Sequence, residues 1–167
     1  ITHSVAPFFE GNVHVLDWLT ITGGLRYTYE YKKIDDFSVA SLIPGAPPVF
    51  LPGFEDFCAV AGIACSDSWD EWTPVAGINA QLADVVDIPS NEGALAYFRY
   101  SRGFKSGGYN GRAATPTSIG PYDPETVDSF EIGLKTDWWE RRLRFNTTLF
   151  WNEYNDKQEE IVQPNEL

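Results

Sequence analysis

The clearest structural signal in the sequence is the stretch LTITGGLRYTYEYK, residues Leu19–Lys32. Its odd-numbered positions hold apolar or aromatic residues and one glycine, whereas its even-numbered positions are mostly polar or charged. Successive side chains of a β-strand point to opposite faces, so this alternation predicts a strand with one greasy and one polar face. The strand exceeds the roughly 5–6 residues usual in globular proteins and reaches the ~9–11 needed to cross a membrane at a tilt.

The same alternation recurs along the chain. It covers residues 5–15, 72–82, 94–105, 129–137 and a segment that starts at Leu143. The connections between these segments alternate in length. They are a tight turn around Asp17, a long loop at 33–70, a shorter segment at 84–93, a second long loop at 106–125, a tight turn at Trp139 and Glu140, and a third long connection from Asn155. Transmembrane barrels keep periplasmic turns short and outer loops long, so we expect the long loops outside.

Aromatic residues gather at the ends of the expected strands. Those beside the tight turns are Trp18, Trp138 and Trp139, and those toward the long loops are Tyr27, Tyr29, Tyr31, Trp69 and Trp72. Two aromatic bands at the two water interfaces are typical of membrane barrels. The sequence therefore predicts an all-β fold, an antiparallel transmembrane β-barrel fragment of about six consecutive strands in up-and-down order. A soluble β-sandwich, whose strands also alternate, stays the alternative.

Bulk properties exclude other classes. A helical membrane span needs about 20 consecutive apolar residues, and the nearest run, Val39–Phe54, is interrupted by four prolines. The formal net charge of −12 argues against nucleic-acid binding. The chain has no Met and starts at Ile1, so we expect a piece of a longer protein.

Two cysteines, Cys58 and Cys65, lie close together in the acidic first long loop. Proximity in an exposed loop predicts a disulfide and an oxidising compartment. Two free thiols are an alternative. No His lies near them, which disfavours a metal site.

No arrangement of side chains in the sequence predicts catalysis. Adjacent acidic residues on a strand point to opposite faces and do not converge, and no Ser, His and Asp set can be assembled. We therefore expect no catalytic residue, no metal ligand, no cofactor and no enzymatic activity.

Three motifs carry a resemblance to a known family. Residues 100–110 read YSRGFKSGGYN, residues 122–125 read YDPE and residues 130–135 read FEIGLK. Together they resemble the late barrel of TonB-dependent outer-membrane receptors, although Phe130 replaces the Tyr that is usual there. The TGGLRY stretch at 22–27 resembles a barrel strand of the same family. The resemblance implies that residues 1–167 are part of the receptor barrel, without the N-terminal plug domain and the remaining strands.

The resemblance also implies a location and a function. The expected location is the outer membrane of a Gram-negative bacterium, and the expected function is energised uptake of a scarce ligand. A ferric siderophore is the default ligand, and cobalamin and oligosaccharides are alternatives. Expected partners are outer-membrane lipid and lipopolysaccharide, the plug, the TonB complex and the ligand, whose contact residues the sequence does not identify. A passive porin and a soluble carbohydrate-binding β-sandwich are the competing functions.

The polar face of the expected strands is the candidate functional surface. Residues expected to face the barrel interior are Arg26, Glu30, Arg99, Glu131, Lys135, Arg144 and Asn146. In the family these charges would pair with the plug or line the path. Pairing between adjacent strands of the wall is the favoured alternative.

Overall fold

The computed structural model describes residues 1–34, 38–39, 49–50, 58–59, 62–87, 91–111 and 119–159. Seven strands form one antiparallel sheet. They are β1 (Thr2–Val5), β2 (Phe8–Leu16), β3 (Leu19–Lys33), β6 (Ser66–Gln81), β7 (Asn91–Lys105), β8 (Glu125–Trp138) and β9 (Leu143–Asn155). Two further strands, β4 (Ser38–Val39) and β5 (Val49–Phe50), pair with each other. The short 3-10 helix η1 (Leu82–Asp84) follows β6. In the part of the chain that the structure describes, no helix is long and apolar enough to cross a membrane.

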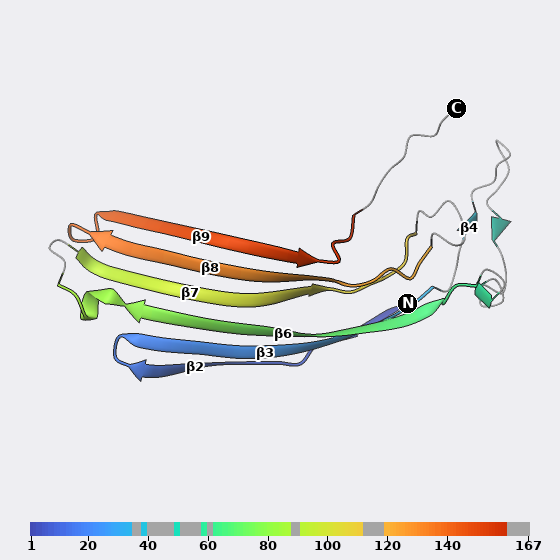
Figure 1. The fold of residues 1–167 in the computed structure, drawn as a ribbon, viewed down its shortest axis with the longest axis horizontal. Helices are drawn as coiled ribbons and strands as arrows, with labels where there is room; N and C mark the ends of the chain where they lie inside the picture. Colours follow the sequence, from blue (N-terminus) through green and yellow to red (C-terminus); the bar gives the residue numbers. More distant parts are fainter. Residues whose placement is uncertain are drawn as a thin grey trace, which may run out of the picture. The chain divides into compact units, whose positions relative to one another are not determined.

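The chain divides into two compact units. Unit 1 consists of Ile1–Val5, Tyr29–Asp70 and Lys105–Pro124, and unit 2 consists of Ala6–Thr28, Glu71–Phe104 and Glu125–Leu167. Within unit 2 the strands β2, β3, β6, β7, β8 and β9 lie side by side in chain order (Figure 1). This up-and-down order confirms the all-β meander that the sequence predicts.

The short connections of unit 2 lie at one end of its strands, on the left in Figure 1. Asp17 and Trp18 alone join β2 to β3, and residues 139–142 join β8 to β9. In the second turn Trp139, Glu140 and Arg141 have φ angles of 53°, 58° and 64°. The turn closes where the Arg142 amide donates to the Trp139 carbonyl over 3.1 Å. Both tight turns are thus where the sequence predicts them.

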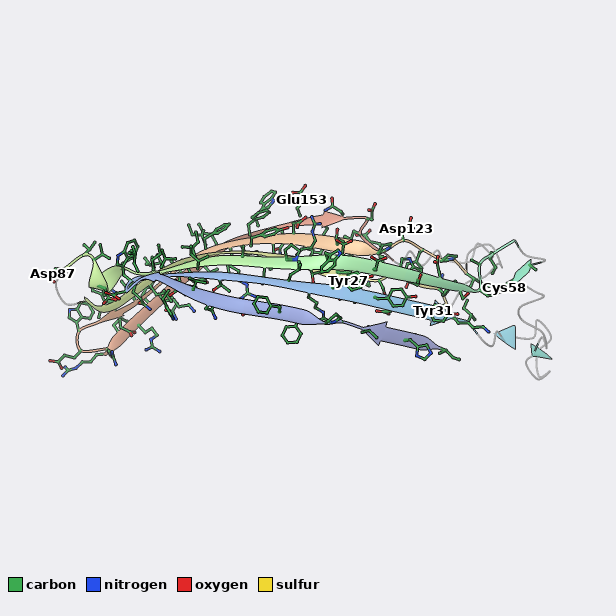
Figure 2. The ribbon with its side chains drawn as sticks, turned by 90° about the horizontal axis from the view of Figure 1, so that it is seen from below. Tyr27, Tyr31, Cys58, Asp87, Asp123 and Glu153 are labelled. Atoms are coloured by element: carbon green, nitrogen blue, oxygen red, sulfur yellow. A yellow bond between two sulfur atoms is a disulfide. The ribbon has the colours of Figure 1, made fainter. Side chains whose placement is uncertain are left out.

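One face of unit 2 is apolar and exposed. The strand register places Phe9 opposite Leu25 and Ile132 opposite Leu149. Ile132 and Leu149 are 58% and 72% exposed. Among the described residues of unit 2, Ala94 is the one buried hydrophobic side chain. Side chains leave the ribbons on both sides, as Figure 2 shows. A β-sandwich would bury such a face in its core, so this unit does not fit the sandwich alternative.

The N-terminal strand prediction is wrong in one respect. The expected strand at 5–15 is two strands, β1 and β2, both paired to β3. Pro7 lies in the break between them, where it has no amide hydrogen to donate to the ladder. Its carbonyl still accepts a hydrogen bond from the Tyr27 amide at 3.0 Å. The sheet therefore has seven strands where the sequence predicts about six.

The expected loop at 33–70 is also too long. Strand β6 begins at Ser66 rather than after Asp70, and β4 and β5 lie inside the expected loop. The first residues of β6, SDSWDE, lack the apolar alternation that reveals a membrane-facing strand. Backbone hydrogen bonds form a strand ladder whatever the side chains are, so a strand can form without alternating polarity. Residues 66–71 therefore belong to β6 although their sequence has no period-two pattern.

Candidate functional site on the polar face

Of the seven residues expected to face the barrel interior, which we call the wall residues, six share one face of unit 2. Lys135 pairs with Asn146 in the β8–β9 register, and Arg99 pairs with Gly77 in the β6–β7 register. A Cβ on Gly77 would contact Thr22 of β3, and one on Gly133 would meet Tyr97 of β7, so these neighbouring strands present that same face. Together with Arg26, Glu131 and Arg144, which have matching positions on their strands, these residues form the surface that we call the polar face.

Tyr97 is the centre of the polar face. Its hydroxyl donates to the Glu131 carboxylate and lies 3.0 Å from the Thr148 hydroxyl. The Lys135 ammonium lies 5.3 Å from the centre of the Tyr97 ring, within the range of a cation–π contact. Tyr97 therefore links β7 to both β8 and β9. Its place in this network depends on the pairing of strands and cannot be read from the sequence.

The charged wall residues differ in their partners. Arg144 binds Asp137 with two hydrogen bonds, from Nε over 2.7 Å and from an Nη over 3.3 Å. Arg26 donates from Nε to the Thr28 hydroxyl over 3.2 Å. Arg99 has no hydrogen-bond or ion-pair partner among the residues that the structure describes. Pairing within the wall thus accounts for Arg144, and it leaves Arg99 unmatched.

Arg99, Glu131 and Lys135 line a groove of about 390 Å³ on the polar face, together with Tyr97 and Asn79. A second groove of about 360 Å³ is lined by Lys135, Arg144 and Asn146. Both grooves belong to unit 2. Among the described residues, no group of three His, Cys, Asp or Glu side chains could hold a metal ion.

Glu30, the seventh predicted wall residue, belongs to unit 1. It forms a salt bridge of 3.0 Å with Lys32. The Lys32 ammonium also donates to the Ser106 hydroxyl and the Gly107 carbonyl, each over 2.7 Å, and lies 5.7 Å from the Trp69 ring centre. Lys32 therefore ties the segment after β7 to β3.

The position of Trp69 in the sequence predicts that it belongs to an aromatic band at the water interface. The structure does not agree with this prediction, because Trp69 is only 8% exposed. Its ring packs edge-on against Tyr109, with the ring centres 6.3 Å apart. The Tyr109 hydroxyl is buried without a hydrogen-bond partner among the described residues. Burial raises the pKa of Tyr109, and Asp67 and Tyr31 add to the rise. The phenol therefore stays protonated to a higher pH than an exposed tyrosine.

A charged network on the opposite face of unit 2 is not predicted from the sequence. Arg102 binds Asp128 with two hydrogen bonds of 2.9 and 2.8 Å, and the Tyr100 hydroxyl donates to the same carboxylate over 2.6 Å. The Tyr100 ring lies 5.1 Å from that of Phe130, which shares the register face of Ile132 and Trp151. Asp128 is the fourth residue of β8. The network therefore joins β7 to β8 near the start of β8.

The structure links Cys58 and Cys65, whose Cα atoms lie 5.9 Å apart. The Ile63 amide donates to the Cys58 carbonyl over 3.0 Å, and the Ile34 amide donates to the Cys65 carbonyl over 2.9 Å. Cys58 is 4% exposed. These contacts fasten the segment before β6 to the end of β3.

Comparison with protein families gives one match. The family described as "TonB dependent receptor-like, beta-barrel" matches residues 1–166. Comparisons with curated proteins and with solved structures gave no match. The family match covers nearly the whole chain and agrees with the antiparallel meander, the exposed apolar face and the polar face opposite. The chain therefore belongs to the TonB-dependent receptor-like β-barrel family.

Proposed function

We propose that this chain is part of the barrel wall of an outer-membrane receptor that takes up a scarce ligand with energy supplied through TonB. The family match over residues 1–166 is the observation that carries the proposal. In this account residues 1–167 supply consecutive barrel strands, while the plug domain and the other strands lie elsewhere in the receptor. A ferric siderophore is the ligand that we propose first, because it is the default expectation for this family.

The two faces of unit 2 support a place in a lipid bilayer. Large apolar side chains such as Leu149 are exposed on one face, whereas the opposite face carries the polar network around Tyr97. A barrel in a membrane exposes its apolar residues to lipid and turns its polar residues to the interior. We therefore assign the polar face, with Arg26, Arg99, Glu131, Lys135, Arg144 and Asn146, to the barrel interior. Glu30 is assigned to the interior as well, by its place on the same side of β3 as Arg26.

Transport separates this proposal from its alternatives. Cells that depend on the full-length receptor should accumulate radioactive iron supplied as ferric siderophores from an iron-starved culture. Accumulation should stop when TonB is removed or a protonophore is added. A passive porin would continue to admit solute under both conditions. A soluble β-sandwich would appear in the soluble fraction without detergent. Either of these results would contradict the proposal.

The long loop between β3 and β6 offers a test of ligand capture. The deletion should cover residues 44–64, so that β6, which begins at Ser66, stays intact. It should be combined with Cys65→Ser, because the deletion removes Cys58. Loops on a rigid scaffold carry binding residues, so we expect weaker binding and uptake with the barrel still assembled. Cys58→Ser with Cys65→Ser, without the deletion, is the matched control. Unchanged uptake in the deletion would show that this loop does not take part in capture.

A further inference from the structure

We propose that Arg99 and Lys135 form a binding site for one anionic group, a carboxylate or a phosphate, on the polar face of unit 2. The inference rests on the proposed function only in placing this face inside the barrel. It starts from the 390 Å³ groove that both residues line together with Glu131. Two cations and one carboxylate in one groove would ordinarily be expected to form an ion pair within the wall.

In the structure, the carboxylate of Glu131 is hydrogen-bonded to the neutral hydroxyl of Tyr97. The Tyr97 hydroxyl donates to Glu131, and the Tyr97 ring is held there because residue 133 is a glycine. A Cβ at position 133 would overlap the ring carbons of Tyr97. Gly133 is buried beneath that ring, so the position of the hydroxyl is determined by packing. Glu131 therefore has a partner that is not a cation.

The two cations keep their hydrogen-bonding capacity. Arg99 has no partner in the described part of the chain. Lys135 has one contact there, with the face of the Tyr97 ring at 5.3 Å from the ring centre, and this leaves its ammonium hydrogens free to donate. The nearest acidic residue along β8, Asp137, is engaged by two hydrogen bonds from Arg144. The groove thus holds two positive side chains and one carboxylate, a net charge of +1, and neither cation forms an ion pair with a residue that the structure describes.

The chemistry of these side chains selects an anion. A guanidinium presents a planar fork of donors that matches carboxylate and phosphate oxygens, and an ammonium adds a point charge. Gly77 lies directly across from Arg99 in the register and places no side chain beside it. Asn79 and Thr22 line the same groove and add polar side chains to it. A metal cation is disfavoured by the two positive charges.

The anion could come from two sources, and they can be separated in the purified full-length receptor in detergent. The first arm uses inorganic phosphate as the probe and follows binding by phosphorus NMR. Wild-type receptor should bind phosphate, and Arg99→Gln with Lys135→Gln should weaken binding at least tenfold. Arg142→Gln with Lys157→Gln removes the same charge from exposed positions and should not change binding. Arg99→Lys with Lys135→Arg keeps the charge and should retain binding.

The second arm applies a carbodiimide to the wild-type receptor and maps cross-links to Lys135. If phosphate does not bind and Lys135 is joined to a carboxylate outside residues 1–167, the site holds a carboxylate of the receptor itself, and the proposal stands. It is overturned if phosphate binding survives in the double glutamine variant. It is also overturned if phosphate does not bind and Lys135 is joined to Glu131 or Asp137, or to nothing. Uptake does not enter either arm, so failure here is distinct from failure of the proposed function.

Discussion

The ring of Tyr97 lies on Gly133 of the neighbouring strand, in the space that a Cβ at residue 133 would need. Because of this contact the Tyr97 hydroxyl reaches both Glu131 and Thr148, so one aromatic residue connects three strands. The polar face is thus organised by a glycine that only the structure reveals as special.

Gly133→Ala should therefore destabilise the receptor. The added methyl group would have to displace the Tyr97 ring, and overpacking of this kind costs about 1–3 kcal/mol. The measurement is the urea midpoint of unfolding in lipid vesicles. Gly23→Ala is the matched control, because a Cβ there meets nothing within 4 Å. If both variants unfold at the same urea concentration, the contact between Tyr97 and Gly133 does not contribute to stability.

The Arg102–Asp128 pair should matter more than an exposed pair of the same charge. The Asp128 side chain is 14% exposed and accepts from both Arg102 and Tyr100. Hydrogen bonds to a charged group contribute more than neutral ones, so Asp128→Ala should cost about 1–3 kcal/mol. Glu140→Ala removes a partner of Arg142 in a pair whose side chains are about 80% exposed. Exposed pairs contribute little, so this control should be near neutral. Equal losses in the two variants would contradict the argument.

Tyr109→Phe should leave unit 1 as stable as before or stabilise it. The Tyr109 hydroxyl is buried without a partner among the described residues, and removal of such a group recovers up to about 1 kcal/mol. The readout is hydrogen exchange of the amides in residues 105–111. Tyr122→Phe is the control, because Tyr122 is 41% exposed. A clear loss of protection in Tyr109→Phe would mean that the hydroxyl has a partner.

The same residue predicts a dependence on pH. The folded chain raises the pKa of Tyr109 above its ordinary value of 10.0, so ionisation favours the unfolded chain. The stability that protonated Tyr109 contributes is fully present below pH 10.0 and is lost as the pH rises through the pKa of the folded chain. The stability of Tyr109→Phe relative to wild type should therefore increase above pH 10.0. A difference in stability that stays constant with pH would contradict this prediction.

The strands were predictable where their two faces differ in polarity. The start of β3 at Leu19, the end of β7 at Lys105 and the start of β9 at Leu143 match the alternating pattern. The start of β6 at Ser66 was not predictable, because its first residues are polar apart from Trp69 and do not alternate. The split between β1 and β2 at Pro7 was missed because period-two alternation continues across it.

The polar face was predictable as a set of residues, and its contacts were not. The period of two along a strand puts Glu131 and Lys135 on one side without any knowledge of neighbouring strands. Which groups bind each other depends on the register between strands, as for Tyr97 with Glu131 and Arg102 with Asp128. A glycine inside a strand, such as Gly133, is compatible with close packing, but the sequence does not show which ring fills the space.

The disulfide between Cys58 and Cys65 stays a prediction for the protein in its compartment. Outside the inner membrane the environment is oxidising, so we expect both thiols to be bonded. Denatured, unreduced receptor should take up no thiol label, and reduced receptor should take up two. Cys58→Ser should expose Cys65 to the label. Two labelled thiols in the unreduced wild type would rule out the bond.

The central claim is that the apolar face of unit 2 contacts lipid, and Arg substitution tests it most directly. Leu25, Ile132 and Leu149 lie on that face, whereas Asn146 lies on the polar face of the same strand as Leu149. Thr28 is a poor control because it is buried and accepts a hydrogen bond from Arg26. In the full-length receptor in lipid vesicles, Arg at Ile132 or Leu149 should lower the free energy of unfolding by about 2–4 kcal/mol, as expected near the bilayer midplane. Leu25→Arg should be destabilising as well, and Asn146→Arg should cost much less. If Asn146→Arg is the damaging change and Leu149→Arg is harmless, the two faces are reversed and the account is wrong.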